Sequence, residues 1–356
     1  MQISSELETF KKVAEKSIYN IDVITGQEWK YNKCFKSILI PLKLKKILSL
    51  ALCHIELGIR VFLGRQKDAI ILHGFSTELL ILTYLFSLFR SKNIYCLTHH
   101  HIQQANYNIL ARIALHVYSR LGYSFIINED AQILKNLGFD ETQTNRHVTM
   151  LHPVIESSPE IFLNLENSVN SDHLVSSDRV KIGIVGKIRP EKKTYKTLSL
   201  LLSLKAKYNF CLIVGTDDFS GLAESINMSD DIVLINTSTR SGYLEALYKS
   251  DIIVLNYEES RYFYRCSGVA ADAIGVKTYV VCPNFFMMRN QLYSPSQVGI
   301  TYDSEGSLEN AIDQAINLSI SSHEENFRMH FEQRSINKIS SDLIEKIETR
   351  IAENKP

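Results

Sequence analysis

Two short stretches in the second half of the chain carry residue types that could bind a phosphorylated ligand. The first is GKIRPEKK at residues 186–193, where a glycine ends an apolar run and Lys187 and Lys192 stand five residues apart. Ammonium groups in a loop after a strand can neutralise the negative charge of a bound phosphate or diphosphate. The sequence therefore predicts an anion-binding turn that begins at Gly186.

The second stretch, residues 251–283, predicts a strand, a polar loop, a helix and another strand. Ser267 is expected to cap the helix, Gly268 lets another backbone approach closely, and the unpaired N–H groups at the helix start suit an anion. Arg265 adds a planar cation that fits phosphate. Asp272, seven residues further on, could accept a hydrogen bond from a sugar hydroxyl. A phosphate and a ribose are therefore the ligand groups that this stretch favours.

Each stretch also has a plainer interpretation. A pair of lysines in a loop is often only an exposed charged turn. The tyrosines of the second loop, Tyr257, Tyr262 and Tyr264, are either a stacking surface for a base or sugar or ordinary core residues. The spacing Gly183-x-x-Gly186 lacks the G-x-G-x-x-G pattern of a dinucleotide site. Two cationic loops that each follow a strand of one domain favour a shared phosphate ligand over these alternatives.

The two stretches resemble the nucleotide-sugar signature of GT-B glycosyltransferases, in particular the retaining enzymes of family 4 (glycosyl transferases group 1). In the Glu-x7-Glu pattern of that family, Asp272 stands at the second Glu and Gly268 at the glycine that meets the diphosphate. Arg265 stands where the family has its first Glu, which is thought to contact the donor sugar. Glu258 and Glu259 are nearby carboxylates that could replace it, or ordinary residues of a solvated loop.

The first stretch resembles the family's G-R-x-x-x-x-K-G pattern, with Lys187 in place of the arginine, Lys192 at the lysine and Lys193 in place of the final glycine. The resemblance implies binding of a nucleoside-diphosphate sugar without a metal ion or other cofactor. It implies transfer of the sugar to a hydroxyl of a glycan or lipid-linked acceptor, in bacterial-type surface polysaccharide or glycolipid assembly. The implied donor-binding residues are Gly186, Lys187, Lys192, Arg265, Ser267, Gly268, Val269 and Asp272. The implied catalytic residues are His100, Lys192 and Arg265.

Three consecutive histidines, residues 99–101, follow a predicted strand and should therefore lie at the carboxyl edge of the first sheet. The family has a Thr-x-His-Asp-like segment here, which Thr98 and His100 match, while His101 replaces the acid. His100 is expected to contact the donor sugar or the acceptor and to help move a proton. A structural role is the plainer alternative. A metal site is disfavoured because adjacent residues of an extended chain point in alternate directions.

Two other functions are compatible with these residues. A catalytically silent GT-B binding subunit that docks on a partner transferase is motivated by Arg265 at the family's Glu position. A sugar-nucleotide epimerase of the same fold would need an acid and a base carboxylate in the cleft.

The elements that must position these residues alternate between short apolar runs and helix-like segments. Strands are expected near residues 21–24, 37–40, 68–72, 94–98, 124–127, 147–151, 180–185, 210–214, 232–235, 252–255 and 278–281. This alternation predicts parallel βαβ units. The expected fold class is α/β, with two Rossmann-like domains of the GT-B type whose parallel sheets face each other across a cleft.

A run rich in Ser, Asn and Asp interrupts the alternation and suggests a domain boundary. We expect an acceptor domain at residues 1–155, a linker at 156–178 and a nucleotide-sugar domain at 179–325. Helices at residues 326–356 are expected to cross back to the first domain.

The amino-acid composition is that of a globular protein. The 356 residues are 45% hydrophobic and 22% charged, with no net charge, which fits a globular protein of two domains. The first 155 residues hold 18 Lys and Arg against 12 Asp and Glu, which favours a local anionic partner over a nucleic acid. Lysines interleave with apolar residues between positions 33 and 48, as in an ordinary charged helix edge or in peripheral contact with an anionic membrane.

The cysteines bear on the compartment. The six cysteines show no C-x-x-C pair, and no apolar stretch is long enough to span a bilayer. Both observations indicate a cytoplasmic protein, with peripheral contact at the inner face of the membrane as the further expectation.

Overall fold

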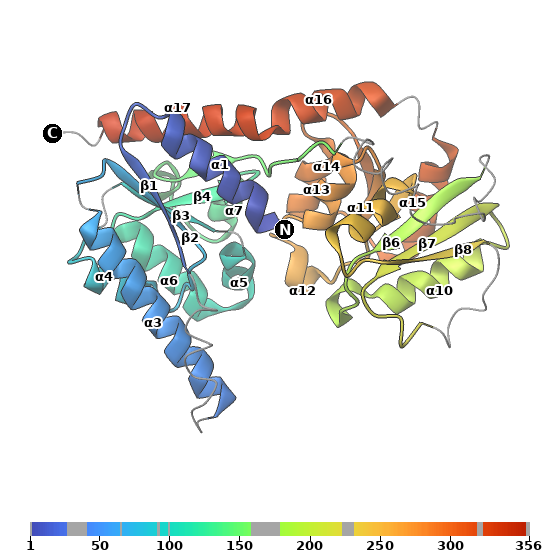
Figure 1. The fold of residues 1–356 in the computed structure, drawn as a ribbon, viewed down its shortest axis with the longest axis horizontal. Helices are drawn as coiled ribbons and strands as arrows, with labels where there is room; N and C mark the ends of the chain where they lie inside the picture. The colour runs from blue at the N-terminus through green and yellow to red at the C-terminus, as the bar shows by residue number, and fades with distance from the viewer. Residues whose placement is uncertain are drawn as a thin grey trace. The chain divides into compact units, whose positions relative to one another are not determined.

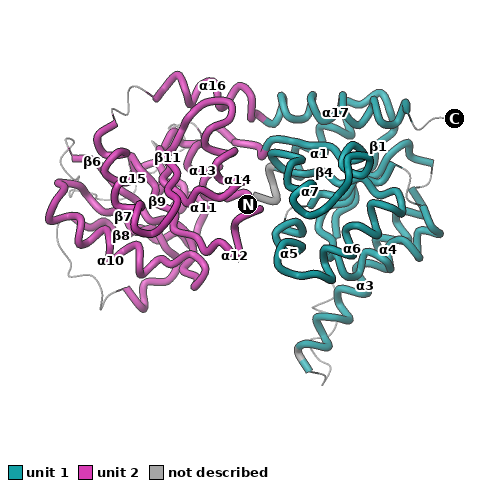
Figure 2. Tube along the Cα trace, turned by 180° about the vertical axis from the view of Figure 1, so that it is seen from behind, with its two compact units in different colours: residues 1–151, 336–356 teal, residues 152–335 magenta. Residues whose placement is uncertain are grey.

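The structure is a computed structural model that describes residues 2–26, 41–64, 66–90, 93–98, 100–157, 179–222, 231–318 and 323–353. The chain divides into two compact units, residues 1–151 with 336–356 (unit 1) and residues 152–335 (unit 2), shown in Figure 2. Residues 152–155 therefore join the second unit, and the terminal helices are divided between the two. The predicted strand at 37–40 and the predicted linker from residue 158 on lie outside the described residues.

Unit 1 is built on a parallel sheet whose strands follow one another in chain order, from β1 to β5. The strands are β1 (Ile21–Thr25), β2 (Ala69–His73), β3 (Ile94–Leu97), β4 (Ser124–Asn128) and β5 (Val148–Met150). The helices are α1 (Gln2–Lys16), α3 (Leu42–Leu63), α4 (Leu80–Phe86), α5 (His101–Tyr107), α6 (Ile109–Arg120), α7 (Gln132–Asn136), α8 (Glu141–Thr144) and α17 (Ile336–Glu353).

The two faces of this sheet are covered differently. Right-handed crossovers between strands in chain order send the connecting helices to one face. Helices α3, α4 and α6 lie on that face, while α1 and α17 cover the other (Figure 1). Alternate residues of β2 show the division, because Ala69 and Ile71 belong to the apolar cluster beneath α1 and α17. Ile70 instead lies close to Gly64, at the end of α3.

Unit 2 has a parallel sheet of order β11-β10-β9-β6-β7-β8. The strands are β6 (Val180–Val185), β7 (Phe210–Thr216), β8 (Ile232–Asn236), β9 (Ile252–Val254), β10 (Tyr279–Pro283) and β11 (Gly299–Tyr302). The helices are the 3-10 helix η1 (Pro190–Lys192), α10 (Thr194–Leu204), α11 (Arg240–Tyr248), α12 (Glu259–Tyr262), α13 (Gly268–Gly275), α14 (Phe286–Tyr293), α15 (Glu305–Asn317) and α16 (Glu324–Arg334). Apolar residues from the strands and from α10, α11, α13 and α15 form one continuous core.

The two parallel sheets confirm the predicted α/β class. The predicted terminal helical region is two helices, with α16 ending before Ser335 and α17 beginning at Ile336. Helix α5 has seven residues, too few to show a periodic apolar pattern in the sequence. None of the helices in the described ranges is long and apolar enough to cross a membrane.

Candidate functional site

The carboxyl ends of β6 and β9 lie side by side in the middle of the second sheet. From β6 the sheet continues through β7 and β8, and from β9 it continues in the opposite direction through β10 and β11. Ligands of open α/β sheets bind outside the strand ends at the point where the strand order reverses. The two cationic loops, residues 186–193 after β6 and 255–267 after β9, flank this point.

The loop after β6 owes its shape to two residues in the left-handed half of backbone space. Gly186 has a φ of +120°, and its N–H donates to the carbonyl oxygen of Gly215, at the end of β7, over 2.8 Å. Lys193 has φ 46° and ψ 35°, a left-handed conformation that costs a non-glycine residue about 1 kcal/mol. Lys193 stands at the final glycine of the resembled pattern, so the backbone keeps a conformation that glycine favours.

The two loops are in direct contact. The N–H of Glu258 donates to the carbonyl oxygen of Glu191 over 2.8 Å. A Cβ atom on Gly186 would lie 3.0 Å from Nζ of Lys192 and 3.8 Å from Cγ2 of Val269, the second residue of α13. Gly186 is therefore the point where the lysine loop and the start of α13 meet, and a glycine is the residue that leaves room there.

Lys192 and Arg265 lie over a stacked pair of tyrosine rings. Nζ of Lys192 is 6.0 Å from the centre of the Tyr257 ring, and Cζ of Arg265 is 5.3 Å from the centre of the Tyr262 ring. The centres of these two rings are 4.0 Å apart. All three tyrosines of the loop, including Tyr264, are buried. Tyr257 and Tyr262 therefore support the two cations and are not a surface on which a base could stack.

The positive charges around Lys192 are only partly compensated. Burial, together with the charges of Arg189 and Arg265, lowers the pKa of the Lys192 amine to about 8, although the carboxylates of Glu191 and Asp217 oppose the shift. A half-buried amine surrounded by arginines gains more from an arriving anion than an exposed lysine does. Of the predicted site residues, Lys192 thus has the surroundings best suited to a diphosphate.

Arg265 has an unused hydrogen-bond donor. Its Nε atom is buried and has no hydrogen-bond partner within the described ranges. Buried donors are normally paired, so this one is open to an acceptor supplied by water or by a ligand. A phosphate oxygen is the acceptor that a guanidinium binds best.

Ser267 caps the amino end of α13. It is the N-cap that the sequence predicts: its Oγ accepts from the N–H of Ala270 over 3.1 Å. The side-chain oxygen of Gln291 accepts a hydrogen bond from the Ser267 N–H over 2.8 Å and so holds the capping residue in place. Gly268 and Val269 are half-exposed, and their N–H groups precede the first intrahelical bond. These two amides stay the predicted anion-binding groups of the helix start.

Asp272 lies on α13 as predicted, but its carboxylate already has two partners. Oδ1 accepts from a guanidinium N–H of Arg240 over 3.0 Å, and Oδ2 accepts from the hydroxyl of Tyr243 over 3.0 Å. A carboxylate can accept further hydrogen bonds, so contact with a sugar hydroxyl stays a prediction. Arg240 and Tyr243, both on α11, are neighbours of the site that the sequence did not indicate.

Lys187 differs from Lys192 in its surroundings. Its side chain is 66% exposed, and Nζ lies 3.1 Å from Oδ2 of Asp217. Asp217 directly follows β7 and is a member of the site that sequence reasoning missed. Its position after a predicted strand, beside the strand that leads to Gly186, is the signal that could have found it. Lys187 as a donor-binding residue stays a prediction.

The histidine run lies at the carboxyl edge of the first sheet, where β3 ends. His99 lies outside the described residues. His100 is exposed, and its ring stacks on that of His101 with 4.3 Å between centres. His101 is buried, stacks on Phe75 and has Nε2 2.9 Å from the Phe75 carbonyl oxygen. Of the two described histidines of this run, His100 is therefore the exposed one, and its contact with a substrate stays a prediction.

Glu78 is a further residue at this edge that the sequence did not indicate. Its carboxylate accepts hydrogen bonds from Ser76 and Gln104, and both bonds lower the Glu78 pKa against the effect of burial. The charge of His100 lowers the Glu78 pKa as well, as the smallest of these effects.

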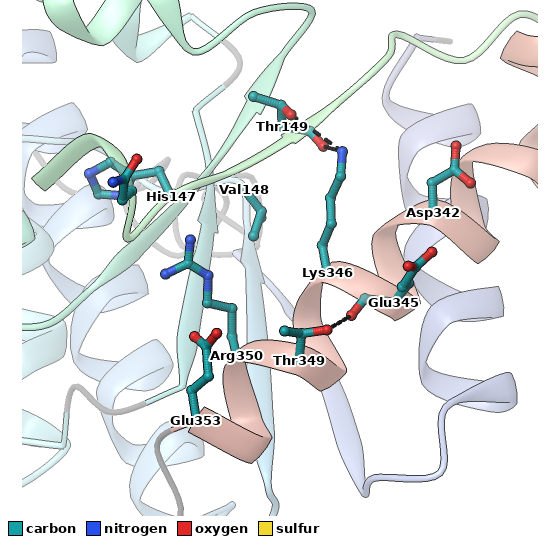
Figure 3. A pocket seen from close by; sticks show the side chains of 10 residues that line it. His147, Val148, Thr149, Asp342, Glu345, Lys346, Thr349, Arg350 and Glu353 are labelled. Atoms are coloured by element: carbon teal, nitrogen blue, oxygen red, sulfur yellow. Dashed lines mark hydrogen bonds between the residues drawn. The ribbon is translucent and has the colours of Figure 1, made fainter. Parts of the chain in front are cut away.

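A larger pocket lies elsewhere in unit 1. It has a volume of about 670 Å³ and is lined by Asn145, His147, Val148, Thr149, Asp342, Glu345, Lys346, Thr349, Arg350 and Glu353 (Figure 3). It is at the amino end of β5, opposite the edge where parallel sheets bind ligands. Its lysine, Lys346, donates to the carbonyl oxygen of Thr149 over 2.7 Å. Its position at the amino end of the strand therefore sets this pocket apart from the edge where a ligand is expected, despite its size. A pocket of about 250 Å³ adjoins the lysine loop, beside Arg189 and Lys193.

Metal binding has no support in the described part of the chain, where no cluster of three or more His, Cys, Asp and Glu side chains could hold an ion. Metal independence of the reaction stays a prediction.

Comparison with known proteins rests on the fold. No protein-family model and no curated protein sequence matches the chain. A solved glycosyltransferase of Rickettsia africae ESF-5 aligns with a TM-score of 0.59 at 12% identity, over 94% of this chain and 98% of that one. Anabaena Alr3699/HepE, in complex with UDP and glucose, aligns with a TM-score of 0.59 at 11% identity, over 92% and 99%.

This chain has the GT-B fold. The GtfA/B complex aligns with a TM-score of 0.57 at 10% identity, over 84% of this chain and 61% of the other, so this chain spans about three fifths of that protein. At these identities the likeness concerns the fold alone. Support for a phosphate ligand therefore comes from the structure of this chain, where Gly186, Lys192 and Arg265 lie near the start of α13.

Proposed function

We propose that this chain is a glycosyltransferase that binds a nucleoside-diphosphate sugar in unit 2 and transfers the sugar to an acceptor hydroxyl. The observation that carries the proposal is the meeting of Lys192, Gly186 and the start of α13 at the point where the strand order reverses. The diphosphate would lie over Gly186. Lys192, Arg265 and the amides of Gly268 and Val269 would surround it.

The chemistry follows from these positions. As the bond between the anomeric carbon and the diphosphate oxygen breaks, its electron pair goes to that oxygen, and the charges of Lys192 and Arg265 stabilise it. The acceptor hydroxyl bonds to the anomeric carbon and loses its proton. His100 of unit 1, exposed beside Glu78, is our candidate to contact the acceptor and take that proton. No step in this scheme requires a metal ion.

The finer assignments come from the family 4 resemblance. We propose a retaining hexosyl transfer to a glycan or lipid-linked acceptor in surface polysaccharide or glycolipid assembly. The Anabaena protein of the same fold, solved with UDP and glucose, supports a donor of the UDP-glucose kind. Cys96, Cys211 and Cys282 are free and buried, which supports a reducing, cytoplasmic location.

A second candidate function is that of a catalytically silent GT-B binding subunit. Arg265 favours it, because this residue replaces a carboxylate of the resembled pattern. An epimerase of the fold is the third. Incubation of the purified chain with UDP, GDP and ADP sugars and a panel of acceptors separates the three. Release of a nucleoside diphosphate that depends on the acceptor supports the proposal. Tight binding without turnover identifies the silent subunit, and interconversion of the donor sugar identifies the epimerase.

A further inference from the structure

Helix α3 is apolar on both of its faces. Cys53, Leu57 and Val61 are buried against the rest of unit 1, as expected of a helix that covers a sheet. The opposite face remains exposed, with Ile47 at 56% and Leu63 at 72% of its surface accessible. The apolar side chains that α3 exposes are Leu44, Ile47, Leu48, Leu52, Ile59 and Leu63. A soluble helix normally turns charged residues outward, so this second apolar face needs an occupant.

The exposed face continues onto the two neighbouring helices. His54 of α3 hydrogen-bonds Thr83 of α4 over 2.9 Å, and the N–H of Ile81 in α4 donates to the hydroxyl of Tyr118 in α6 over 3.0 Å. The three helices lie on the same face of the sheet (Figure 1). We call the exposed residues of α3, of α4 with its following turn, and of α6 the apolar layer.

The apolar layer holds most of the exposed apolar side chains of the described residues. Sixteen of the twenty-four large hydrophobic residues that are exposed fall between positions 44 and 117, on this layer and the adjoining α5. Besides α3, the main contributions come from Leu85, Phe86, Leu88, Phe89, Ile109, Leu110, Ile113 and Val117. Scattered exposed leucines are normal, whereas a concentration on one face marks an interaction surface.

The charge of the same helices identifies the kind of occupant. Across residues 42–63, 80–90 and 101–120 the chain has seven basic residues and one acidic residue, Glu56. The guanidinium groups of Arg90 and Arg112 donate to backbone carbonyl oxygens, which do not neutralise their charge. Lys43 and Lys46, exposed near the start of α3, flank its apolar stripe. Lysines in this position can keep their ammonium groups at a polar surface while their neighbours enter an apolar phase.

We infer that the apolar layer docks on the surface of a membrane that contains anionic lipid. Apolar side chains over three helices would enter the acyl boundary, and the lysines and arginines would pair with lipid phosphates. A second copy of the chain is the disfavoured occupant, because two such faces would bring their basic residues together. The inference goes beyond the proposed donor chemistry and does not require it.

Docking through the apolar layer would bring the predicted acceptor-binding edge of unit 1 close to the membrane. Crossover helices of a parallel sheet begin at the edge where the preceding strand ends, so the lysine-bearing start of α3 lies toward the carboxyl edge of the first sheet. His100 lies at the same edge. An acceptor embedded in the membrane would thus reach the side of unit 1 that carries His100.

Vesicle sedimentation of the full chain, without any sugar nucleotide, tests the inference. Vesicles of phosphatidylcholine with about a third phosphatidylglycerol should bind the protein, and vesicles of phosphatidylcholine alone should bind it at least tenfold more weakly. The double variant Lys43→Glu with Lys46→Glu should lose more than tenfold in binding. The triple variant Leu44→Ser, Ile47→Ser and Leu48→Ser should lose as much, because these side chains supply the apolar contact.

Matched variants on the other face of the same sheet serve as controls. Lys11→Glu with Lys16→Glu changes two exposed lysines of α1, and Ile18→Ser removes an exposed apolar side chain. Both should bind vesicles like the unaltered protein. Equal loss in these controls, or no binding of the unaltered protein to anionic vesicles, overturns the inference. So does a dimer in analytical ultracentrifugation that the triple variant abolishes while vesicle binding persists.

Discussion

The amine of Lys192 lies 3.0 Å from the position that a Cβ atom would take on Gly186. The contact explains why the loop requires glycine at its first position and shows where the lysine charge is held. It also places that charge beside Val269, at the start of α13. A diphosphate bound over Gly186 would therefore meet an ammonium group and two helix amides at once.

Substitution of Gly186 by alanine should weaken nucleoside-diphosphate binding by at least tenfold and destabilise unit 2 by about 1–2 kcal/mol. The added methyl group would displace the Lys192 amine, and the φ of +120° disfavours any side chain. Isothermal titration and urea unfolding measure the two effects. Gly138→Ala is the control, since Gly138 has a φ of +87° with no atom within 4 Å of the added Cβ. That variant should lose stability and keep its affinity; a Gly186→Ala protein that also keeps its affinity would contradict the site.

Donor binding should weaken as the pH rises through about 8. The Lys192 amine has a pKa of about 8, lowered by burial and by the charges of Arg189 and Arg265, so it is mostly protonated at pH 7. By pH 9 only about a tenth of it remains charged in the free protein. Affinity for UDP or GDP should therefore fall by up to tenfold per pH unit above 8. In Lys192→Arg the decline should be absent up to pH 10, because arginine stays protonated. The same decline in that variant would assign the titration to another group.

Lys193 offers a test of backbone conformation apart from charge. Lys193→Ala and Lys193→Gly both remove the ion pair in which Nζ lies 2.8 Å from a carboxylate oxygen of Glu305. Only glycine adopts the left-handed conformation of this residue without cost. The glycine variant should therefore be more stable than the alanine variant by about 1 kcal/mol in urea unfolding. Equal stabilities would mean that the turn does not hold this conformation in solution.

Unit 1 should lose stability in mild acid because of His147. Burial, with smaller effects of Arg350 and Arg146, lowers the His147 pKa to about 3, against about 6.5 in the unfolded chain. The unfolded state therefore binds the extra proton, and the contribution of this group to stability is complete above pH 6.5 and declines toward pH 3. The slope from this residue should approach about 1.4 kcal/mol per pH unit.

Nδ1 of His147 accepts from the Phe125 N–H over 2.9 Å, a bond that protonation would break. His147→Asn keeps an acceptor and removes the titration, so unfolding measured between pH 6.5 and 4.5 should show a shallower slope. His116→Asn is the matched control, because His116 is a histidine of the same unit whose Nε2 lies 3.1 Å from the carbonyl oxygen of Leu137 and not beside a backbone N–H. An unchanged slope in His147→Asn would place the acid sensitivity elsewhere.

The sequence was sufficient where the signal is local. Ser267 as an N-cap, Gly186 at a strand end and the alternation of strands and helices follow from neighbouring residues, and the structure has all three. The same holds for the position of His100 after β3, at the carboxyl edge of the first sheet.

Residues joined by the sheet order were not predictable in this way. Asp217 reaches Lys187 because β7 lies beside β6, and Arg240 reaches Asp272 because α11 packs near α13. Neither neighbour can be identified until the strands are placed. Tyr257 and Tyr262 illustrate a different limit, because an aromatic ring suits a binding surface and a core equally well and only burial distinguishes them.

The convergence of Lys192 and Arg265 on one diphosphate is tested most directly by the affinity of three variants for UDP, GDP and ADP, measured by titration calorimetry. The account predicts that Lys192→Ala and Arg265→Ala each weaken binding of the same nucleotide by more than tenfold. Arg261→Ala, which removes an exposed arginine from the neighbouring α12, should leave the affinity within about twofold. Unchanged binding in either Lys192→Ala or Arg265→Ala would contradict the central claim.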